Sequence, residues 1–397
     1  MFPFAPRPVS AASRLLLFGL LCCVAAPAVA ADPPAEPDVT PADHPYRAIH
    51  AARTIGRYDK DGDGAFGPGD GAGRWRSVAE YDADGDGLVS EAELAAAPIP
   101  YLPAAGGRDL NVLYKSTPQG DLYLDLYRPA ADAPGERDGR RPLAIYIHGG
   151  GWLNGNKQLL VTSKLRPVYE RLLDAGYCVA AFDYRLCEPG SGVTIRDCVV
   201  DVKDALRFLS ADAERFGVDP HRVVVSGTSA GAHLAQMLAL TEPRSLTGDP
   251  ALADVDYTVR AAVSWYGPTD FEKTELFDHD GKNYFRENLA TRLFGPDPLS
   301  SEEETRRSRA VSPVQFLHPA NPPLLLIQGD SDPIVPLAHA AYMKERAEAV
   351  GAPVELLVVK KGDHGWWGTA GTPLEPSVDA IVDRTFTFLT APRTEAD

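Results

Sequence analysis

The fold is decided by the stretch RVVVSGTSAG, residues 222–231. Its first half is a β-branched run typical of a buried strand, and an apolar helical pattern follows over 230–240. Between them, residues 227–231 have the G-x-S-x-G pattern of a tight turn that lifts a serine hydroxyl above a sheet. Glycine is needed at both flanking positions, because side chains there would collide with the neighbouring strand and helix. Ser229 is therefore the candidate nucleophile.

Apolar runs and helical patterns alternate on both sides of this turn. Strands are predicted at 122–127, 143–147, 178–182, 223–226, 261–265, 324–327 and 354–359. Helices are predicted at 165–175, 195–215, 230–240, 338–350 and 378–389. This order predicts an α/β fold with a mostly parallel central sheet and helices on both faces. Residues 269–319 interrupt the alternation with a polar, mixed segment, which we expect to form a cap over the site.

A glycine-rich turn, HGGGW at 148–152, follows the strand predicted at 143–147. The backbone N–H groups of Gly150 and Gly151 could approach a substrate closely there, and the N–H of Ala230 would join them. Such donors stabilise the oxyanion of a tetrahedral intermediate. His148 could be a catalytic base at the end of its strand, but we favour a structural role in which it holds the glycine turn.

The catalytic base and its acidic partner are expected after the nucleophile, in the order serine, acid, histidine. Asp332 lies in GDSDPIVP (329–336) and His364 in GDHG (362–365), each directly after a predicted strand. Both loops therefore lie at carboxyl ends of strands, where parallel sheets bind their ligands. His364 is the candidate base and Asp332 the candidate acid, with Asp330 as a second candidate for the acid.

Five segments, HGGGW, DYRL (183–186), GTSAG, DSDPIVP and GDHGW, resemble in order and spacing the esterase and lipase branch of the α/β-hydrolase superfamily. The resemblance is strongest to the feruloyl-esterase-like and acetyl-xylan-esterase-like carboxylesterases. The hormone-sensitive-lipase-like and kynurenine-formamidase-like groups come next. It implies an α/β-hydrolase fold, the triad and oxyanion donors named above, and catalysis without a cofactor.

Two Asp/Gly-rich loops precede this region. DADGDGLVSEAE (82–93) fits the twelve-residue EF-hand loop, with acids at positions 1, 3 and 5, glycine at 6 and glutamate at 12. DKDGDGAFGPGD (59–70) fits less well, because the aspartate at position 12 reaches less easily for bidentate binding. We expect the loops to share a short helix over 74–81. The alternative is a pair of acidic turns that bind nothing.

Calcium in a structural role is the one cofactor that these loops predict. In the first loop the candidate ligands are Asp59, Asp61, Asp63, Ala65 and Asp70. In the second loop they are Asp82, Asp84, Asp86, Leu88 and Glu93, and Ala65 and Leu88 would each contribute a backbone carbonyl. Val89, at position 8, is the apolar residue expected to pair with the partner loop.

The chain is expected to divide into a secretory signal peptide (1–30), a flexible linker (31–45), an EF-hand-like calcium-binding module (46–97) and an α/β-hydrolase catalytic domain (98–397). The signal peptide rests on Arg7 and Arg14, an apolar run over 15–24 and the small-residue tail at 28–30. That run is shorter than the roughly 20 apolar residues that cross a membrane. We therefore expect a secreted or periplasmic protein with no membrane span in the mature chain.

The net charge of −16 disfavours nucleic acid and anionic membranes as partners. The expected partner is a small-molecule or polysaccharide-linked ester, and the acidic module could bind a protein or a surface. Cys178 is expected to be a buried apolar residue. Cys187 and Cys198 flank a Pro/Gly/Ser-rich loop and are predicted to form a disulfide.

The leading hypothesis is a carboxylesterase that hydrolyses carboxylic esters, acyl esters on plant polysaccharides among them. One alternative is an amide hydrolase of the kynurenine-formamidase-like type that uses the same triad. Another is a non-catalytic, calcium-dependent interaction protein built on a hydrolase fold. Trp152, Trp366 and Trp367 flank the predicted site and could either stack on an acyl group or belong to the core.

Overall fold

The computed structural model describes residues 40–70, 78–285, 289–294, 302–366 and 372–392. The expected signal peptide, the first part of the expected linker (31–39) and the first half of the expected shared helix (74–77) lie outside these residues. Across the described ranges, we find no helix that is both long and apolar enough to cross a membrane.

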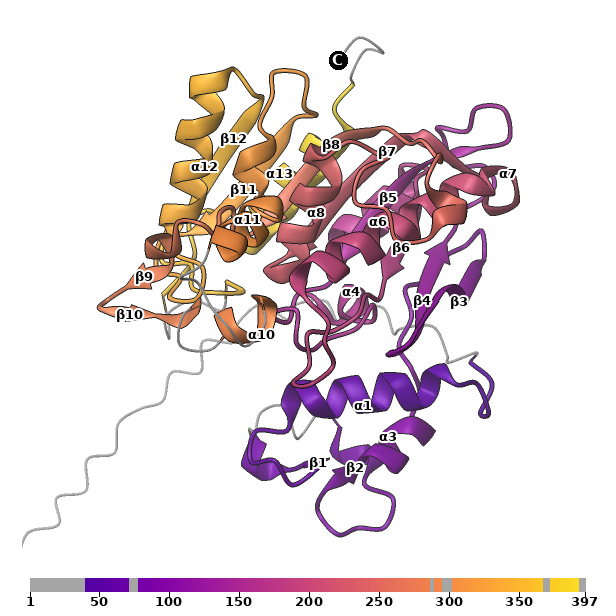
Figure 1. Cartoon of the computed structure of the whole chain (residues 1–397). Helices are drawn as coiled ribbons and strands as arrows, with labels where there is room; N and C mark the ends of the chain where they lie inside the picture. The colour runs from indigo at the N-terminus through magenta and orange to yellow at the C-terminus, as the bar shows by residue number, and fades with distance from the viewer. Residues whose placement is uncertain (1–39, 71–77, 286–288, 295–301, 367–371, 393–397) are drawn as a thin grey trace, which may run out of the picture. The chain divides into compact units, whose positions relative to one another are not determined.

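The central sheet has eight strands, and its make-up confirms the predicted α/β class. The strands are β3 (Arg108–Thr117), β4 (Gly120–Tyr127), β5 (Arg141–Ile147), β6 (Cys178–Phe182), β7 (Val218–Thr228), β8 (Val259–Trp265), β11 (Leu324–Gly329) and β12 (Val354–Val359). Their order is β12-β11-β8-β7-β5-β6-β4-β3 (Figure 1). Strands from β12 to β6 run parallel, whereas β4 pairs antiparallel with β6 and with β3.

All seven predicted strands are present in the central sheet, and β3 is the one of its eight strands that the sequence did not predict. It lies at the edge of the sheet, and many of its side chains are only partly buried, so its sequence lacks the apolar run of the inner strands.

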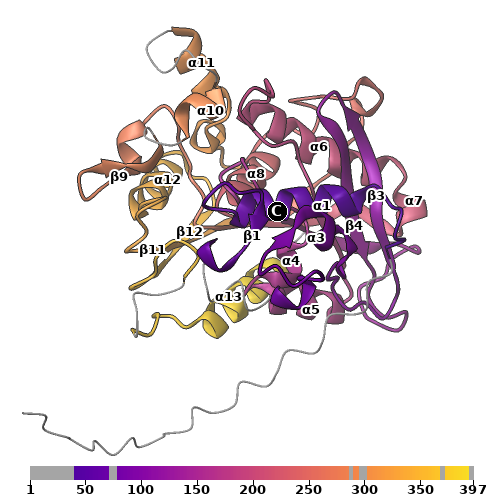
Figure 2. The ribbon, with the colours of Figure 1, turned by 90° about the horizontal axis from the view of Figure 1, so that it is seen from below.

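Alternate residues of the inner strands face two separate apolar cores. Leu143, Ile145 and Ile147 of β5 belong to one core, while Ala144 and Tyr146 belong to the other. Helices α6 (Ile195–Ala211), α8 (Ala230–Leu240) and α12 (Leu337–Val350) cover the first face, and α5 (Arg166–Asp174) and α13 (Val378–Thr390) cover the second, as Figure 2 shows. Both faces are therefore covered, as a parallel sheet requires.

The helix predicted at 195–215 is in fact two helices. The first, α6, ends at Ala211, and α7 (Ala213–Phe216) follows after Asp212. Gly217 then ends α7 in a left-handed conformation, which glycine adopts readily. Two other short elements lie between the strands of the central sheet. They are α4 (Leu159–Thr162), after β5, and the 3-10 helix η3 (Pro250–Leu252), before β8.

The described part of the expected cap, 269–319, consists of short elements around an aromatic cluster. They are η4 (Thr274–Phe277), β9 (Asp278–His279), β10 (Lys282–Asn283), α10 (Ala290–Phe294), α11 (Glu302–Ala310) and η5 (Pro313–Phe316). Phe271 contacts Phe277, Phe285 and Phe294, and its ring also lies 5.7 Å from that of Trp152. The segment therefore packs against Trp152, the last residue of the HGGGW turn.

The N-terminal region is built around one helix and a two-stranded ribbon. Its elements are α1 (Tyr46–Tyr58), β1 (Ala65–Phe66), η1 (Pro68–Asp70), η2 (Ala79–Tyr81), β2 (Val89–Ser90) and α3 (Glu91–Ala96). Phe66 pairs with Val89 across the ribbon, so each acidic loop contributes the residue at its eighth position. Within the described part of the expected helix 74–81, residues 79–81 form a single 3-10 turn.

The expected linker and the expected boundary at 97/98 remain predictions. Among the described linker residues, Thr40 is buried and accepts a hydrogen bond from Asn111, whereas residues 41–43 and 45 are exposed. Residues on both sides of the expected boundary belong to one compact unit.

The predicted disulfide is absent. Cys187 and Cys198 are free, buried thiols whose sulfurs lie 3.7 Å apart, well beyond the roughly 2.05 Å of a disulfide bond. The thiol of Cys198 instead donates to the carbonyl of Arg185. Cys178 is buried as expected, and burial raises the pKa of its thiol to about 11.

Candidate active site

Ser229 sits on a sharp turn between β7 and α8. Its φ of 52° and ψ of −118° are rare for a residue with a side chain. A Cβ at Gly227 would lie 2.3 Å from the carbonyl oxygen of Gly231, and one at Gly231 would lie 2.1 Å from that of Ile147. The two glycines are thus required by close backbone contacts, as the motif predicts.

Three side chains from separate loops form one hydrogen-bonded chain. His364 Nε2 lies 2.9 Å from Ser229 Oγ, and His364 Nδ1 lies 2.8 Å from Asp332 Oδ2. Ser229 and His364 are partly exposed, while Asp332 is buried. The structure therefore brings together all three residues of the predicted triad, with the imidazole between hydroxyl and carboxylate.

Asp332 and Asp330 have different surroundings. Asp332 Oδ1 accepts the backbone N–H groups of Ile334 and Val335, and its Oδ2 accepts from Gln328 as well as from His364. Asp330 instead accepts the backbone N–H of Lys361 and so fastens the turn before His364. Asp332 is therefore the carboxylate that contacts the histidine.

The glycine turn directs two backbone N–H groups outward. His148 Nδ1 donates to the carbonyl of Gly149 (2.9 Å), and the carbonyl of Gly150 accepts from Leu153 (3.1 Å) and Asn154 (3.2 Å). In a planar trans peptide the C=O and the following N–H point in opposite directions. The N–H groups of Gly150 and Gly151 therefore point away from these partners, and among the described residues neither N–H meets a protein acceptor.

Glycine is required in this turn by its backbone angles and its packing. The φ of Gly150 is 129° and that of Gly151 is 63°. A Cβ on Gly150 would lie 1.9 Å from the carbonyl oxygen of Asn154. A Cβ on Gly149 would lie 3.2 Å from that of Ser229, so the turn adjoins the nucleophile. Ala230, the third predicted donor, is the first residue of α8, where backbone N–H groups have no partner within the helix.

His148 has a structural position. Its ring stacks on Tyr184 at 4.2 Å, and the Tyr184 hydroxyl donates to the backbone carbonyl of His148. Burial lowers the pKa of His148 to about 3, so the imidazole is neutral near pH 7. A neutral ring with its proton on Nδ1 can hold the carbonyl of Gly149, as the structural interpretation requires.

The tryptophans beside the site belong to the core. Trp152 is buried against His233 and Phe271, and Trp366 is buried against Tyr266. Neither offers a free ring face for an acyl group, so the alternative in which these two rings stack on an acyl group is wrong, and the core alternative holds. Trp367 lies outside the described residues.

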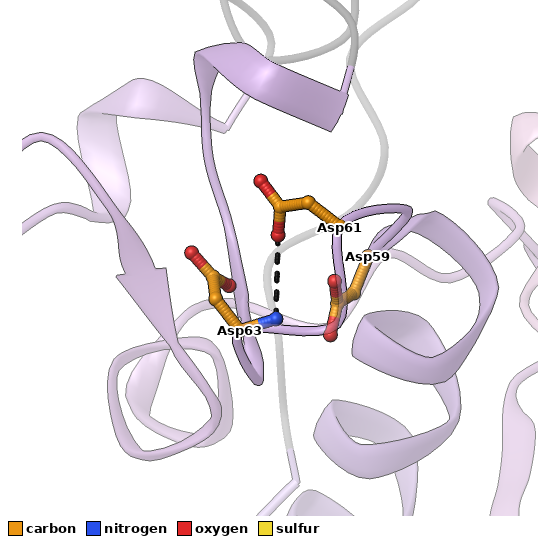
Figure 3. A group of neighbouring side chains, drawn as sticks. All are labelled: Asp59, Asp61 and Asp63. Carbon is orange, nitrogen blue, oxygen red and sulfur yellow. Dashed lines mark hydrogen bonds between the residues drawn. The ribbon is translucent and has the colours of Figure 1, made fainter.

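The acidic loops each gather three carboxylates. Asp59, Asp61 and Asp63 have ligand oxygens within 4.8 Å of one another, and the same holds for the second set, namely Asp82, Asp84 and Asp86. Figure 3 shows the first set on its tight loop, where the Asp63 N–H donates to Asp61.

The remaining candidate ligands do not belong to these two groups. Ala65 and Leu88 offer only backbone carbonyls, and the carboxylates at position 12 of each loop accept backbone N–H groups. Asp70 accepts from the backbone N–H groups of Lys60 and Gly67. Glu93 accepts from those of Ala83, Asp84 and Ser90.

Sequence reasoning missed two sets of residues around the site. Gln328, which donates to Asp332, was signalled only by being polar within the apolar strand LLLIQG. Asn154 and Arg57, which lie behind the glycine turn, carried no signal, because their hydrogen bond joins residues 97 positions apart.

Comparisons with known proteins give a family and several esterase relatives. Residues 124–347 match the family model described as BD-FAE. A probable carboxylic ester hydrolase, LipM of Mycobacterium tuberculosis, is 28% identical over 68% of this chain and 62% of its own length. The isoprenylcysteine alpha-carbonyl methylesterase ICME of Arabidopsis thaliana is 27% identical over 64% of this chain and 56% of its own. The chain thus spans less than two thirds of either relative.

Solved structures show the same fold. A thermophilic esterase from Thermogutta terrifontis, Est2 with butyrate bound, has a TM-score of 0.57 and 27% identity, covering 75% of this chain and all of that one. A truncated carbohydrate esterase from gut microbiota has a TM-score of 0.58 at 22% identity. The chain therefore has an α/β-hydrolase fold. Because the matched segment covers more than half of the chain and includes the glycine turn, Ser229 and Asp332, the chain belongs to the BD-FAE family.

Proposed function

We propose that this protein is a serine carboxylesterase in which Ser229, His364 and Asp332 form the catalytic triad. The observation that carries the proposal is the continuous chain of hydrogen bonds from Ser229 Oγ through both imidazole nitrogens to Asp332. Curated relatives named as ester hydrolases support the reaction class.

In the proposed reaction, Ser229 Oγ attacks the ester carbonyl while its proton passes to His364 Nε2. Asp332 stabilises the resulting imidazolium and holds its tautomer through Nδ1. The N–H groups of Gly150, Gly151 and Ala230 would stabilise the oxyanion. His364 then protonates the leaving alcohol, giving an acyl-enzyme, and a water activated by the same imidazole releases the acid and regenerates Ser229.

A fluorophosphonate probe tests this proposal directly. We expect the wild type to be labelled and Ser229→Ala to be unlabelled, because labelling requires an activated serine. Esterase 2 of Thermogutta terrifontis, 26% identical to this chain, has been solved phosphonylated by sarin. An unlabelled, folded wild type would favour a non-catalytic interaction protein.

We propose carboxylic esters with a small acyl group as the substrate class, in line with the butyrate bound to the Thermogutta esterase. The sequence resemblance adds esters on polysaccharides to this proposal. Rates on acetyl, feruloyl and longer-chain esters, compared with formyl amides, test the choice. Faster turnover of formyl amides would select the amide hydrolase instead.

We also propose that the two acidic loops bind Ca²⁺ in a structural role. Three grouped carboxylates in each loop suit a cation that prefers oxygen ligands, and the pairing of Phe66 with Val89 joins the two loops. Bound calcium would supply the positive charge that offsets repulsion within each group. Its ligands would be those named from the sequence, with Asp70 and Glu93 turning from backbone N–H groups toward the ion.

Export and the cap are further proposals. Residues 1–30 have the pattern of a secretory signal peptide, which supports a secreted or periplasmic location. The cap proposal for 269–319 is supported by Leu289, whose side chain would lie 3.7 Å from a Cβ on Gly151. N-terminal sequencing of protein recovered outside the cytoplasm tests the first of these.

A further inference from the structure

Helix α1 of the N-terminal region contacts the segment that follows the glycine turn. Arg57 Nη1 donates to Asn154 Oδ1 at 3.0 Å. Arg53 forms an ion pair with Asp183 at 3.2 Å and donates to the backbone carbonyl of Tyr184 at 3.1 Å. Thr54, one turn before Arg57, is hydrogen-bonded to Asn156. One face of α1 is thus bound to two loops of the catalytic domain.

Asn154 connects Arg57 to the candidate oxyanion donors. The Asn154 side chain accepts from Arg57, while its backbone N–H donates to the carbonyl of Gly150 at 3.2 Å. That carbonyl shares its peptide plane with the N–H of Gly151, so its direction sets the direction of the N–H. The backbone N–H of Leu153 donates to the same carbonyl at 3.1 Å, so Asn154 is one of two donors that orient the N–H of Gly151.

Arg53 is connected to the same turn through Asp183 and Tyr184. Asp183, its buried partner, accepts the backbone N–H of Lys157, three residues after Asn154. The neighbouring Tyr184 stacks on His148, whose Nδ1 holds the carbonyl of Gly149 and with it the N–H of Gly150. Arg57 is therefore connected to the N–H of Gly151 through Asn154. Arg53 is connected to the N–H of Gly150 through Tyr184 and His148.

We propose that helix α1 positions the oxyanion turn, with Arg57 and Asn154 as positioning residues for the N–H of Gly151. This inference rests on the proposed esterase function. It gives the N-terminal module a part in catalysis that is separate from any ion in its loops, because the contacts come from the helix and need no ligand. In this proposal both residues act through the backbone of the turn and not directly on the substrate.

A positioning role predicts a specific kinetic signature. An oxyanion donor acts mainly in the transition state, so its misplacement lowers kcat and leaves KM nearly unchanged. Complete loss of one such donor costs about 10²–10³ in kcat. Because the N–H of Gly151 would be misdirected and not removed, we expect a smaller loss, of about 10-fold.

The test uses Arg57→Met, which keeps an apolar stem but removes the donors, together with Asn154→Ala and the double variant, in the full chain. We expect each single variant to lower kcat about 10-fold with KM changed less than about 2-fold, and the double variant to be no slower than either single variant. Arg57→Lys should recover part of kcat. Lys60→Met, which removes an exposed cation of the same module, is the matched control and should keep kcat.

Unchanged kcat in Arg57→Met, or kcat losses that multiply in the double variant, would overturn the proposal. If Arg57→Met does not fold, Asn154→Ala decides alone, because its side chain lies outside the module. Failure of the esterase function is a separate outcome: the wild type would then escape fluorophosphonate labelling before any variant is compared.

Discussion

Gln328 donates from Nε2 to Asp332 Oδ2 at 3.0 Å, and the same nitrogen donates to the carbonyl of Val335 at 2.7 Å. Together with the backbone N–H groups of Ile334 and Val335, and with His364, this gives Asp332 four hydrogen-bond donors. A carboxylate surrounded by donors is fixed in orientation. Asp332 can therefore hold the imidazole of His364 in a single orientation.

Asp332→Asn should nearly abolish turnover. The amide nitrogen would face at least one of the donors that now surround the carboxylate, and the histidine would lose its charged partner. In a comparable serine protease triad, the same substitution lowers kcat about 10⁴-fold, and we expect a loss of similar size. Asp330→Asn is the control: Asp330 accepts from Lys361 and does not contact His364, so kcat should change little. A large loss in Asp330→Asn alone would contradict this assignment.

Gly231→Ala and Gly56→Ala should change stability in opposite directions. A Cβ on Gly231 would meet the carbonyl oxygens of Ile147 and His148, both backbone atoms that cannot move aside. Gly56 lies exposed in the last turn of α1, and its Cβ would have no neighbour within 4 Å. We expect Gly56→Ala to raise the free energy of unfolding by about 0.5–1 kcal/mol, and Gly231→Ala to lower it strongly. Urea unfolding of both variants checks the contrast.

The sequence predicted the triad for a topological reason. Parallel strands place their carboxyl ends at one edge of the sheet, so the loops after β7, β11 and β12 all lie at that edge. Once Ser229, Asp332 and His364 were assigned to those loops, their location at one edge followed without knowledge of side-chain packing. The prediction of a disulfide between Cys187 and Cys198 was wrong, because spacing along the chain says nothing about how two side chains are oriented.

Residues that support the site from a distance could not be predicted in this way. Thr40 sits in a Pro-rich stretch that local composition indicates to be flexible, yet it is held by Tyr101 and Asn111. Arg57 reaches Asn154 only because α1 packs on the catalytic domain, and no periodic pattern encodes that contact. Tertiary packing between segments distant in the sequence decides these positions.

Calcium removal should lower the thermal midpoint of unfolding. The grouped carboxylates of each loop repel one another unless a cation is bound, so excess chelator should destabilise the N-terminal module. We expect Ca²⁺ to restore the midpoint, and Asp82→Ala to weaken this response more than Asp59→Ala, because the second loop has glutamate at position 12. Calorimetric scans with and without Ca²⁺ measure both effects. Identical scans would rule out structural calcium.

Glu93 should make the module sensitive to acid. The pKa of Glu93 is lowered to about 2, chiefly by the backbone hydrogen bond from Ser90 in the capping box of α3. Because the folded-state pKa lies below the ordinary value of 4.5, the unfolded chain binds the proton more readily. The stabilisation is therefore complete above about pH 4.5 and is lost as the pH falls toward about 2.

In Glu93→Gln this pH-dependent contribution should vanish, since glutamine can still accept from Ser90 but does not titrate. Thermal midpoints of the wild type and Glu93→Gln, measured in chelator to exclude metal binding, should converge as the pH is lowered from 6 to 3. The wild type should be the more stable protein at pH 6. A difference that stays constant over this range would mean that the Glu93 carboxylate is not held by the α3 capping box in solution.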